Sequence, residues 1–220
     1  MAIVRTSPTT GYYLDIYRSS HPVSNEYVYH NIGHQLELKD SKGNPITLSA
    51  THFPISQKPL DPPGFSAIKN FQSTGETNHD IVALFSIKEK NQPNKYMQVF
   101  FAGENKRNFY TGMAPATKTA DPAFRYITTP TLIARQSGEA VTKPFIAVYE
   151  PFSADSSKTV DRIEIEDRSD PATFSAFNVI HKNGNRQLIL QSTNENKGQQ
   201  KNQWRFKGHF GVINLINGKP

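Results

Sequence analysis

Hydrophobic and polar positions alternate along much of this chain. In residues 11–18, Tyr12, Leu14 and Ile16 fall on one face of an extended segment, and Asp15 falls on the opposite face. This period of two is typical of β-strands with one buried face. Further strand signals lie in residues 26–31, 34–40, 81–88, 96–103, 108–114, 129–140, 143–151, 161–167, 177–192 and 204–215.

Turn-forming residues separate these segments. The sequence DSKGNP (40–45) followed by ITLSA (46–50) predicts a hairpin, and Asn183-Gly184-Asn185 predicts another between two apolar runs. Residues 51–79 are rich in Pro, Ser and Thr, which indicates a long irregular loop or an edge excursion. Since no segment shows a sustained helical period, we expect an all-β antiparallel β-sandwich with few or no helices.

Composition supports a packed core of this kind. The chain has 220 residues, of which 36% are hydrophobic, with 14 Phe and 9 Tyr, so a single sandwich domain over residues 1–220 is expected. The absence of Cys excludes disulfides, thiolate metal sites and cysteine nucleophiles. The first residues, MAIVRTSPTTGYY, do not have the apolar stretch of a signal peptide, and no run reaches the roughly 18 apolar residues of a membrane span.

Positive charge is concentrated near the C-terminal end. The net charge is +6; residues 1–180 hold 18 Lys and Arg against 18 Asp and Glu, and the last forty hold seven against Glu195 alone. Such a basic patch can attract sulfated or uronic polysaccharides. The alternative is that the Lys and Gln residues of NENKGQQKNQ (194–203) keep a surface loop solvated.

Five residues are candidates for contact with carbohydrate. Tyr27 and Tyr29 could stack on sugar rings beside a donor from His30, and Lys201 and Arg205 could attract acidic groups. The alternative for the first three is a half-buried strand, with the tyrosines in the core and the histidine bonded to a neighbour.

Four charged residues are candidates for a structural polar network. Asp15, Arg18 and Arg135 occur inside apolar strand segments, where an unpaired charge is costly, so we expect some of them to bond to one another or to turn backbone. Glu139 could join them. A catalytic role would need two carboxylates at a defined separation across a cleft, which sequence spacing does not supply.

Motifs of other site classes are missing. There is no HExxH, GxSxG, P-loop or GxGxxG motif, and the isolated Gly residues are typical of turns. His30 and His34 are four apart, but Gly33 lies between them in a strand or turn, whereas that spacing joins two ligands on a helix. We therefore expect no metal site and assign no catalytic residue.

Three blocks of sequence resemble bacterial heparinase II/III-like proteins. They are VRTSPTTGYYLDIYRS (4–19), EYVYHNIGHQLELKDSKGNPITL (26–48) and TPTLIARQSGEAVTKPFIAVYEP (129–151). The third is the most specific, and the resemblance covers most of residues 1–215. It is to the C-terminal part of those proteins, beyond their helical toroid and the first part of their sandwich.

The resemblance implies a supersandwich-like accessory module of an exported, periplasmic or secreted polysaccharide lyase. In such enzymes the catalytic Tyr, His and Asn or Glu groups, and often a structural zinc, lie in the toroid and early sandwich. No position of this sequence matches those motifs, so neither catalytic residues nor cofactors are carried over. The expected partners are the catalytic toroid domain, acidic polysaccharide and, through an open sheet edge near residues 2–18, a second copy of the chain.

Two other functions stay open at this point. One is a free-standing carbohydrate-binding module for acidic polysaccharides, and the other is a complete small lyase that uses Tyr and His residues of this chain. Because no nucleic-acid motif accompanies the basic tail and no apolar span is present, we expect neither nucleic acid nor a membrane as a partner.

Overall fold

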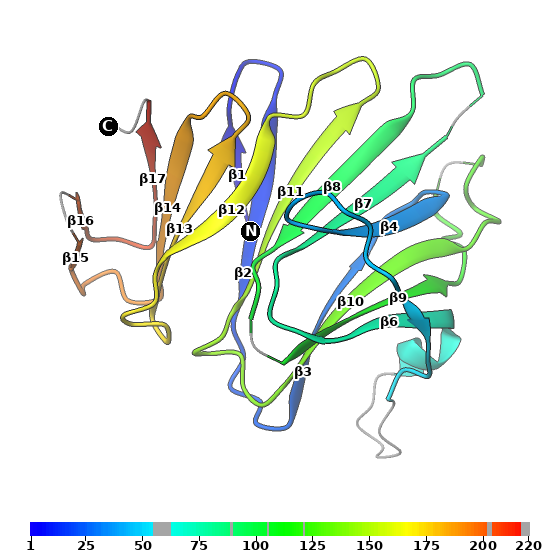
Figure 1. Ribbon diagram of the computed structural model, residues 1–220, viewed down its shortest axis with the longest axis horizontal. Helices are drawn as coiled ribbons and strands as arrows, with labels where there is room; N and C mark the ends of the chain where they lie inside the picture. Colours follow the sequence, from blue (N-terminus) through cyan, green and yellow to red (C-terminus); the bar gives the residue numbers. More distant parts are fainter. Residues whose placement is uncertain (55–62, 89, 105, 121, 202–203, 217–220) are drawn as a thin grey trace.

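The computed structural model describes residues 1–54, 63–88, 90–104, 106–120, 122–201 and 204–216 (Figure 1). Within these residues the chain forms three large β-sheets and one small sheet, and every strand pair is antiparallel. The one helical segment among them is the short 3-10 helix η1 (Pro63–Ala67). The predicted all-β antiparallel sandwich is confirmed.

A six-stranded sheet forms the middle layer of the molecule. In spatial order its strands are β1 (Ala2–Arg5), β2 (Gly11–Tyr17), β11 (Phe145–Ser153), β8 (Lys95–Phe101), β7 (Ile81–Ile87) and β4 (Gln35–Asp40). Both faces of this sheet carry buried apolar side chains, so that β11 is buried at six consecutive positions. A strand covered on both faces needs apolar residues on both, which explains the unbroken run FIAVY.

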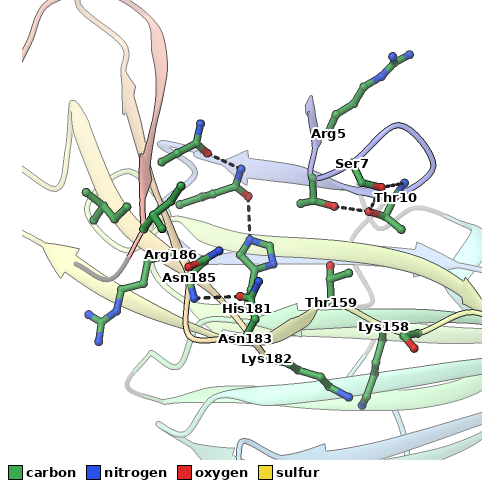
Figure 2. A pocket seen from close by; sticks show the side chains of 16 residues that line it. Arg5, Ser7, Thr10, Lys158, Thr159, His181, Lys182, Asn183, Asn185 and Arg186 are labelled. Carbon is green, nitrogen blue, oxygen red and sulfur yellow. Dashed lines mark hydrogen bonds between the residues drawn. The ribbon is translucent and has the colours of Figure 1, made fainter. Parts of the chain in front are cut away.

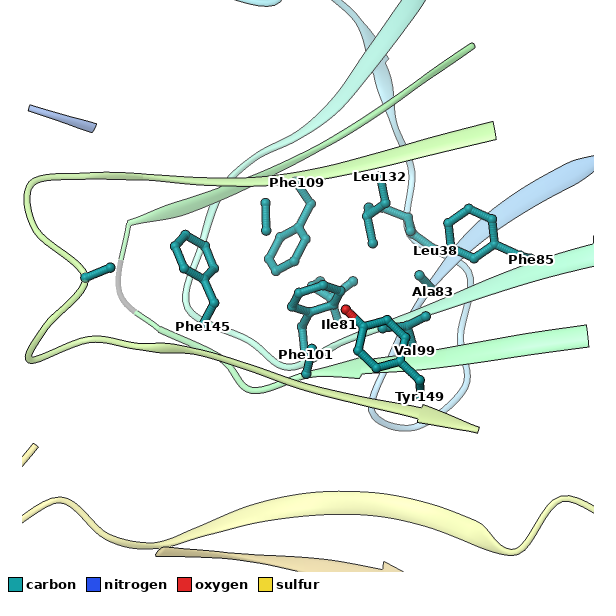
Figure 3. Packing of buried hydrophobic residues seen from close by; sticks show 13 residues of the cluster. Leu38, Ile81, Ala83, Phe85, Val99, Phe101, Phe109, Leu132, Phe145 and Tyr149 are labelled. Atoms are coloured by element: carbon teal, nitrogen blue, oxygen red, sulfur yellow. The ribbon is translucent and has the colours of Figure 1, made fainter. Parts of the chain in front are cut away.

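A five-stranded sheet covers one face of the middle layer. Its strands, in spatial order, are β3 (Ser24–His30), β10 (Thr129–Ser137), β9 (Arg107–Ala114), β6 (Lys69–Thr77) and β5 (Ser49–Ala50). The core between the two sheets is aromatic: Phe85, Phe101, Phe109 and Phe145 are all fully buried there (Figure 3). Rings from both sheets meet edge to face, as Phe101 and Phe109 do at 5.5 Å between centroids.

A four-stranded sheet covers the other face. Its strands are β12 (Val160–Asp167), β13 (Phe174–His181), β14 (Arg186–Ser192) and β17 (Phe210–Leu215). Figure 1 shows it on the left, with the six-stranded sheet between it and the five-stranded sheet. Tyr12, Leu14 and Val148 of the middle layer pack there against Phe177 and Ile189.

Smaller clusters cover part of the two outer faces. On the outside of the four-stranded sheet, the hairpin of β15 (Gln199–Lys201) and β16 (Trp204–Phe206) packs on Phe174, and the indole of Trp204 lies 5.9 Å from the Phe174 ring. On the outside of the five-stranded sheet, Phe53 stacks on Phe71 at 5.3 Å. Because the β15–β16 hairpin covers the outer face of β13 and the middle layer covers its inner face, all eight residues of β13 are buried.

The predicted faces of residues 11–18 are confirmed. Tyr12 and Leu14 point toward the four-stranded sheet, and Ile16 packs beside them. Asp15 points the other way, because its carboxylate accepts a hydrogen bond from Tyr27 of the five-stranded sheet. Successive side chains of a strand point to opposite faces, so the local sequence pattern is sufficient to predict which face each of these residues occupies.

Two local predictions are wrong. Part of the expected loop 51–79 is the nine-residue strand β6, whose sequence KNFQSTGET lacks alternation and which is held by pairing with β9. The turn at 40–45 forms, with Gly43 at a positive φ of 88°, but the expected second strand of the hairpin does not. Pairing there is limited to an isolated bridge between Lys39 and Pro45 and a hydrogen bond from the Ile46 amide to the Leu38 carbonyl, and β5 pairs with β6 instead. Residues 55–62 of the expected loop lie outside the described part of the chain.

Gly103, which follows β8, gives a prediction about packing. A Cβ at this position would lie 2.7 Å from the carbonyl carbon of His79 and 2.8 Å from the amide nitrogen of Asp80, and backbone cannot yield as a side chain can. Gly103→Ala is therefore expected to lower the free energy of unfolding by about 1–3 kcal/mol, measured by urea denaturation. Gly64→Ala is the matched control, since nothing lies within 4 Å of its Cβ position. Equal stability of the two variants would contradict the close approach.

Candidate functional site

A wide cavity lies at one end of the sandwich, where loops of two sheets meet. It has a volume of about 620 Å³ and is formed by the β1–β2 loop, the β11–β12 loop, the β13–β14 turn and the end of β17. In Figure 1 these segments gather along the upper left edge. We call this cavity the loop-end groove and define it by Arg5, Lys158, His181, Lys182, Arg186 and Asn214, among its other lining residues.

The charge of the loop-end groove is entirely positive. Arg5, Lys158, Lys182 and Arg186 line it, and none of its described lining residues is Asp or Glu. Figure 2 shows Lys158 and Lys182 extending from neighbouring loops along one side. Burial, and then the positive charge of Lys182, lower the pKa of Lys158. The groove therefore concentrates like charges that an anion would stabilise.

Two loops of the groove are held by short-range hydrogen bonds. In the β1–β2 loop the Ser7 hydroxyl accepts from the backbone amides of Thr9 and Thr10 at 3.2 and 3.0 Å. In the β13–β14 turn the side-chain oxygen of Asn183 accepts from the Asn185 amide at 3.0 Å, and Gly184 takes a positive φ of 84°. These serine and asparagine contacts are the local reason why the chain turns at these points.

A chain of hydrogen bonds crosses the floor of the groove. His181 Nε2 lies 2.9 Å from Gln187 Oε1, and Gln187 Nε2 donates to Asn214 Oδ1 at 2.9 Å (Figure 2). Because the Gln187 amide nitrogen is used toward Asn214, its oxygen faces the histidine, and His181 Nε2 is the donor. The other ring nitrogen, Nδ1, has no hydrogen-bond partner among the described residues. In Figure 2 this nitrogen is turned toward the side of the groove where Thr159 lies.

The β11–β12 loop is anchored by a buried carboxylate. Glu150, only 3% exposed, accepts through Oε1 from the Thr159 amide at 2.5 Å, the Thr159 hydroxyl at 2.8 Å and the Val160 amide at 3.0 Å. Next to it, Lys158 donates to Gln98 Oε1 at 3.1 Å. The middle sheet thus holds the loop that carries one of the groove's four cations.

The aromatic candidates from the sequence lie elsewhere, on β3. Tyr27 and Tyr29 are half-buried and pack against the core between the five- and six-stranded sheets. The Tyr27 hydroxyl bonds to Asp15 at 2.7 Å and to the Tyr149 hydroxyl. His30 is exposed, and its Nδ1 lies 2.7 Å from the Thr131 hydroxyl. Only part of each tyrosine ring remains available to a ligand.

The basic candidates lie on the β15–β16 hairpin. Arg205 is exposed, on β16, and Lys201 is the last residue of β15, with its side chain outside the described part of the structure. This hairpin covers the outer face of the four-stranded sheet, whereas Tyr27, Tyr29 and β3 belong to the five-stranded sheet on the far side of the middle layer. The five predicted carbohydrate contacts therefore do not form one surface.

The four predicted network residues have separate partners. Arg18 donates to Gln191 and Ser175 of the four-stranded sheet, both at 2.6 Å, and Asp15 bonds to Tyr27 as described. No hydrogen bond or ion pair in the described residues joins any two of the four, so of the two expected kinds of partner it is the backbone that the structure shows.

The other two members bond to backbone, as the sequence allowed. Arg135 pairs with Glu26 at 3.2 Å and donates to the Pro54 carbonyl at 2.6 Å. Glu139 accepts from the amides of Val141 and Thr142, and the hydrogen bonds with Thr142 lower the pKa of its carboxyl group. Arg135 thus fixes the backbone at Pro54, and Glu139 fixes the loop that contains Val141 and Thr142.

Sequence reasoning missed the loop-end groove because its cations come from distant segments. Lys182 and Arg186 flank the predicted turn at Asn183-Gly184-Asn185, which is a local signal of paired charges at a loop tip. Arg5 and Lys158 carry no such signal. In the described part of the chain no three His, Asp or Glu side chains are placed to hold a metal ion, and no helix is long and apolar enough to cross a bilayer.

Fold and groove together define a layered antiparallel β-sandwich module with a cationic groove lined by hydroxyl and amide groups. No protein-family model matches the chain. The chain is homologous to a polysaccharide lyase: it is 29% identical over 223 residues to a curated protein of Formosa agariphila named endo-acting ulvan lyase. The alignment covers 98% of this chain and 27% of that lyase, so the chain spans about a quarter of its relative's length.

Proposed function

We propose that this chain is an accessory β-sandwich module of a heparinase II/III-like polysaccharide lyase and supplies no catalytic group of its own. The observation that carries the proposal is the coverage: nearly the whole chain aligns with a lyase, yet it accounts for only 27% of that enzyme. The part of that lyase outside the alignment is long enough to contain a separate catalytic region.

The environment of the tyrosines supports an accessory role. β-Elimination of a uronate needs a base that removes a proton and an acid that protonates the leaving oxygen. Burial raises the pKa of Tyr27 and Tyr149, and the hydroxyls of these two residues bond to each other between two sheets. Burial likewise raises the pKa of Tyr29, to about 12. Tyrosine hydroxyls whose pKa is raised in this way stay protonated near neutral pH, so they are poor bases for the proton removal.

In this proposal the partner is a catalytic toroid domain, and the setting is the periplasm or the extracellular space, as in exported lyases. The middle sheet offers a place for docking, since β1 is its edge strand and Ile3 on that strand is 68% exposed. A structural zinc, where the parent enzyme has one, belongs to the other domain.

The proposal is tested by incubating the purified chain with ulvan, heparin, chondroitin and alginate. We expect no rise in the ultraviolet absorbance of the unsaturated uronate that elimination creates. The Formosa agariphila ulvan lyase, assayed on ulvan in parallel, is the positive control. A steady rise with the isolated chain would overturn the accessory role and favour the complete small lyase.

A further inference from the structure

We infer that the loop-end groove binds a segment of anionic polysaccharide through its sulfate or carboxylate groups. The inference deepens the proposed function, because it gives the accessory module a ligand and a surface. It also moves the glycan-binding surface from the residues that the sequence suggested to a different end of the molecule.

The first argument is the state of the cations. No carboxylate of the described residues pairs with Arg5, Lys182 or Arg186, and Lys158 donates only to the neutral Gln98. By contrast, Arg135, Arg162 and Arg168 elsewhere each have an acidic partner. Glu150 and Asp161 act electrostatically on Lys158, but neither forms an ion pair with it. The four cations therefore face the groove without an ion-pair partner among the described residues, and a bound polyanion would reduce their mutual repulsion while it gains charge-assisted hydrogen bonds.

The second argument is the neutral lining between the cations. Hydroxyl groups of Thr6 and Ser7 and side-chain amides of Asn183 and Asn185 make this lining polar, although the two hydroxyls and the Asn183 oxygen also bond within the loops. The amide N–H groups of Asn183 and Asn185 are donors of the kind that bind sugar hydroxyls. The volume of about 620 Å³ falls within the range of roughly 300–1,000 Å³ that is usual for ligand sites.

The third argument distinguishes a glycan from nucleic acid. Binding of single-stranded nucleic acid depends on aromatic side chains on which bases stack. No Phe, Tyr or Trp is among the described residues that line the groove. Alternating anionic and hydroxyl groups on a sugar chain fit this lining better than stacked bases do.

The test compares two double variants with the same change of charge. Lys182→Gln with Arg186→Gln removes two groove cations, and Lys201→Gln with Arg205→Gln removes two from the β15–β16 hairpin. Affinities of the full chain are measured by calorimetry for a sulfated galactan, a polyuronate, ulvan, neutral dextran and duplex DNA, at low and moderate salt. Thermal unfolding of each variant checks that it is folded.

We expect the groove variant to bind the anionic glycans about 10- to 100-fold more weakly, as two charge-assisted hydrogen bonds are lost. The hairpin variant should stay within about threefold of the unchanged chain, and dextran should not bind. The sulfated galactan and the polyuronate show whether sulfate or carboxylate is the group recognised.

Three results would overturn the inference: no binding of any anionic glycan, a larger loss in the hairpin variant than in the groove variant, or duplex DNA binding as tightly as the glycans. These outcomes are independent of the elimination assay. A chain that binds in the groove and also makes unsaturated product retains this inference and loses only the accessory role.

Discussion

Arg107→Ala is expected to lower the free energy of unfolding by about 3–5 kcal/mol, because it leaves a cavity and buried acceptors without their donor. The Arg107 side chain is fully buried. Its guanidinium donates to Gln136 Oε1 at 2.5 and 3.2 Å and to the carbonyls of Ala102 and Lys143 at 3.2 and 3.3 Å. It also lies 4.2 Å from the centroid of the Phe145 ring. Burial lowers the pKa of this guanidinium.

The effect is large because the Arg107 side chain both fills space in the core and supplies the donors for several buried acceptors. Alanine leaves a cavity and removes the donor from Gln136 Oε1 and from the carbonyls of Ala102, Lys143 and Pro144. Each buried acceptor left unsatisfied costs about 1–3 kcal/mol. Arg107→Met fills much of the space but restores no donor, so it should fall between alanine and the unchanged chain. Urea denaturation measures all three. Arg205→Ala, at an exposed position, is the control and should change stability by less than about 0.5 kcal/mol. A loss below about 1 kcal/mol for Arg107→Ala would show that the polar contacts of Arg107 are dispensable.

Glu150→Ala is expected to cost about 2–4 kcal/mol, as two backbone amides lose a charged acceptor. The amides are those of Thr159 and Val160, which lie at the end of the β11–β12 loop. Loss of these two hydrogen bonds releases the loop that carries Lys158. The affinity of the loop-end groove for an anionic glycan should therefore fall as well.

Glu150→Gln is the matched variant for this prediction. It retains an oxygen at the Oε1 position, and Oε2 has no hydrogen-bond partner in the described structure, so the amide nitrogen displaces no contact. Its loss of stability should be less than half that of alanine. Hydrogen exchange at Thr159 and Val160 reports the loop directly. Unchanged protection of both amides in Glu150→Ala would refute the anchoring role.

Local sequence patterns were sufficient where the structure depends on neighbours along the chain. The alternation through Tyr12, Leu14 and Ile16 gave the correct face for each residue, and the Gly184 turn formed where its residues favour it. β6 escaped prediction because KNFQSTGET shows no alternation, and the pairing that makes it a strand comes from β9, some forty residues further on. Tertiary contacts decide such a segment.

The candidate site was harder to predict, and for a similar reason. Strand alternation did not show that Tyr27 would face Asp15 and Tyr149 across two sheets, because that contact depends on how the layers stack. Likewise, the positive charge of the sequence is densest near Lys201 and Arg205, whereas the groove draws single cations from several loops. Charge density along a chain and charge density on a surface are different quantities.

The strand order of the middle sheet has a consequence for the synthesis of the chain. β2 lies between β1 and β11, with Leu14 beside Val148, whereas the four-stranded sheet joins strands that follow closely in sequence. A ribosome that adds roughly 5–20 residues each second therefore delivers the β1–β2 hairpin many seconds before its third strand. During that interval the apolar side of the hairpin, with Tyr12 and Leu14, is uncovered and open to aggregation. Chaperones that shield nascent strands are thus most needed soon after this hairpin leaves the ribosome, long before the last sheet exists.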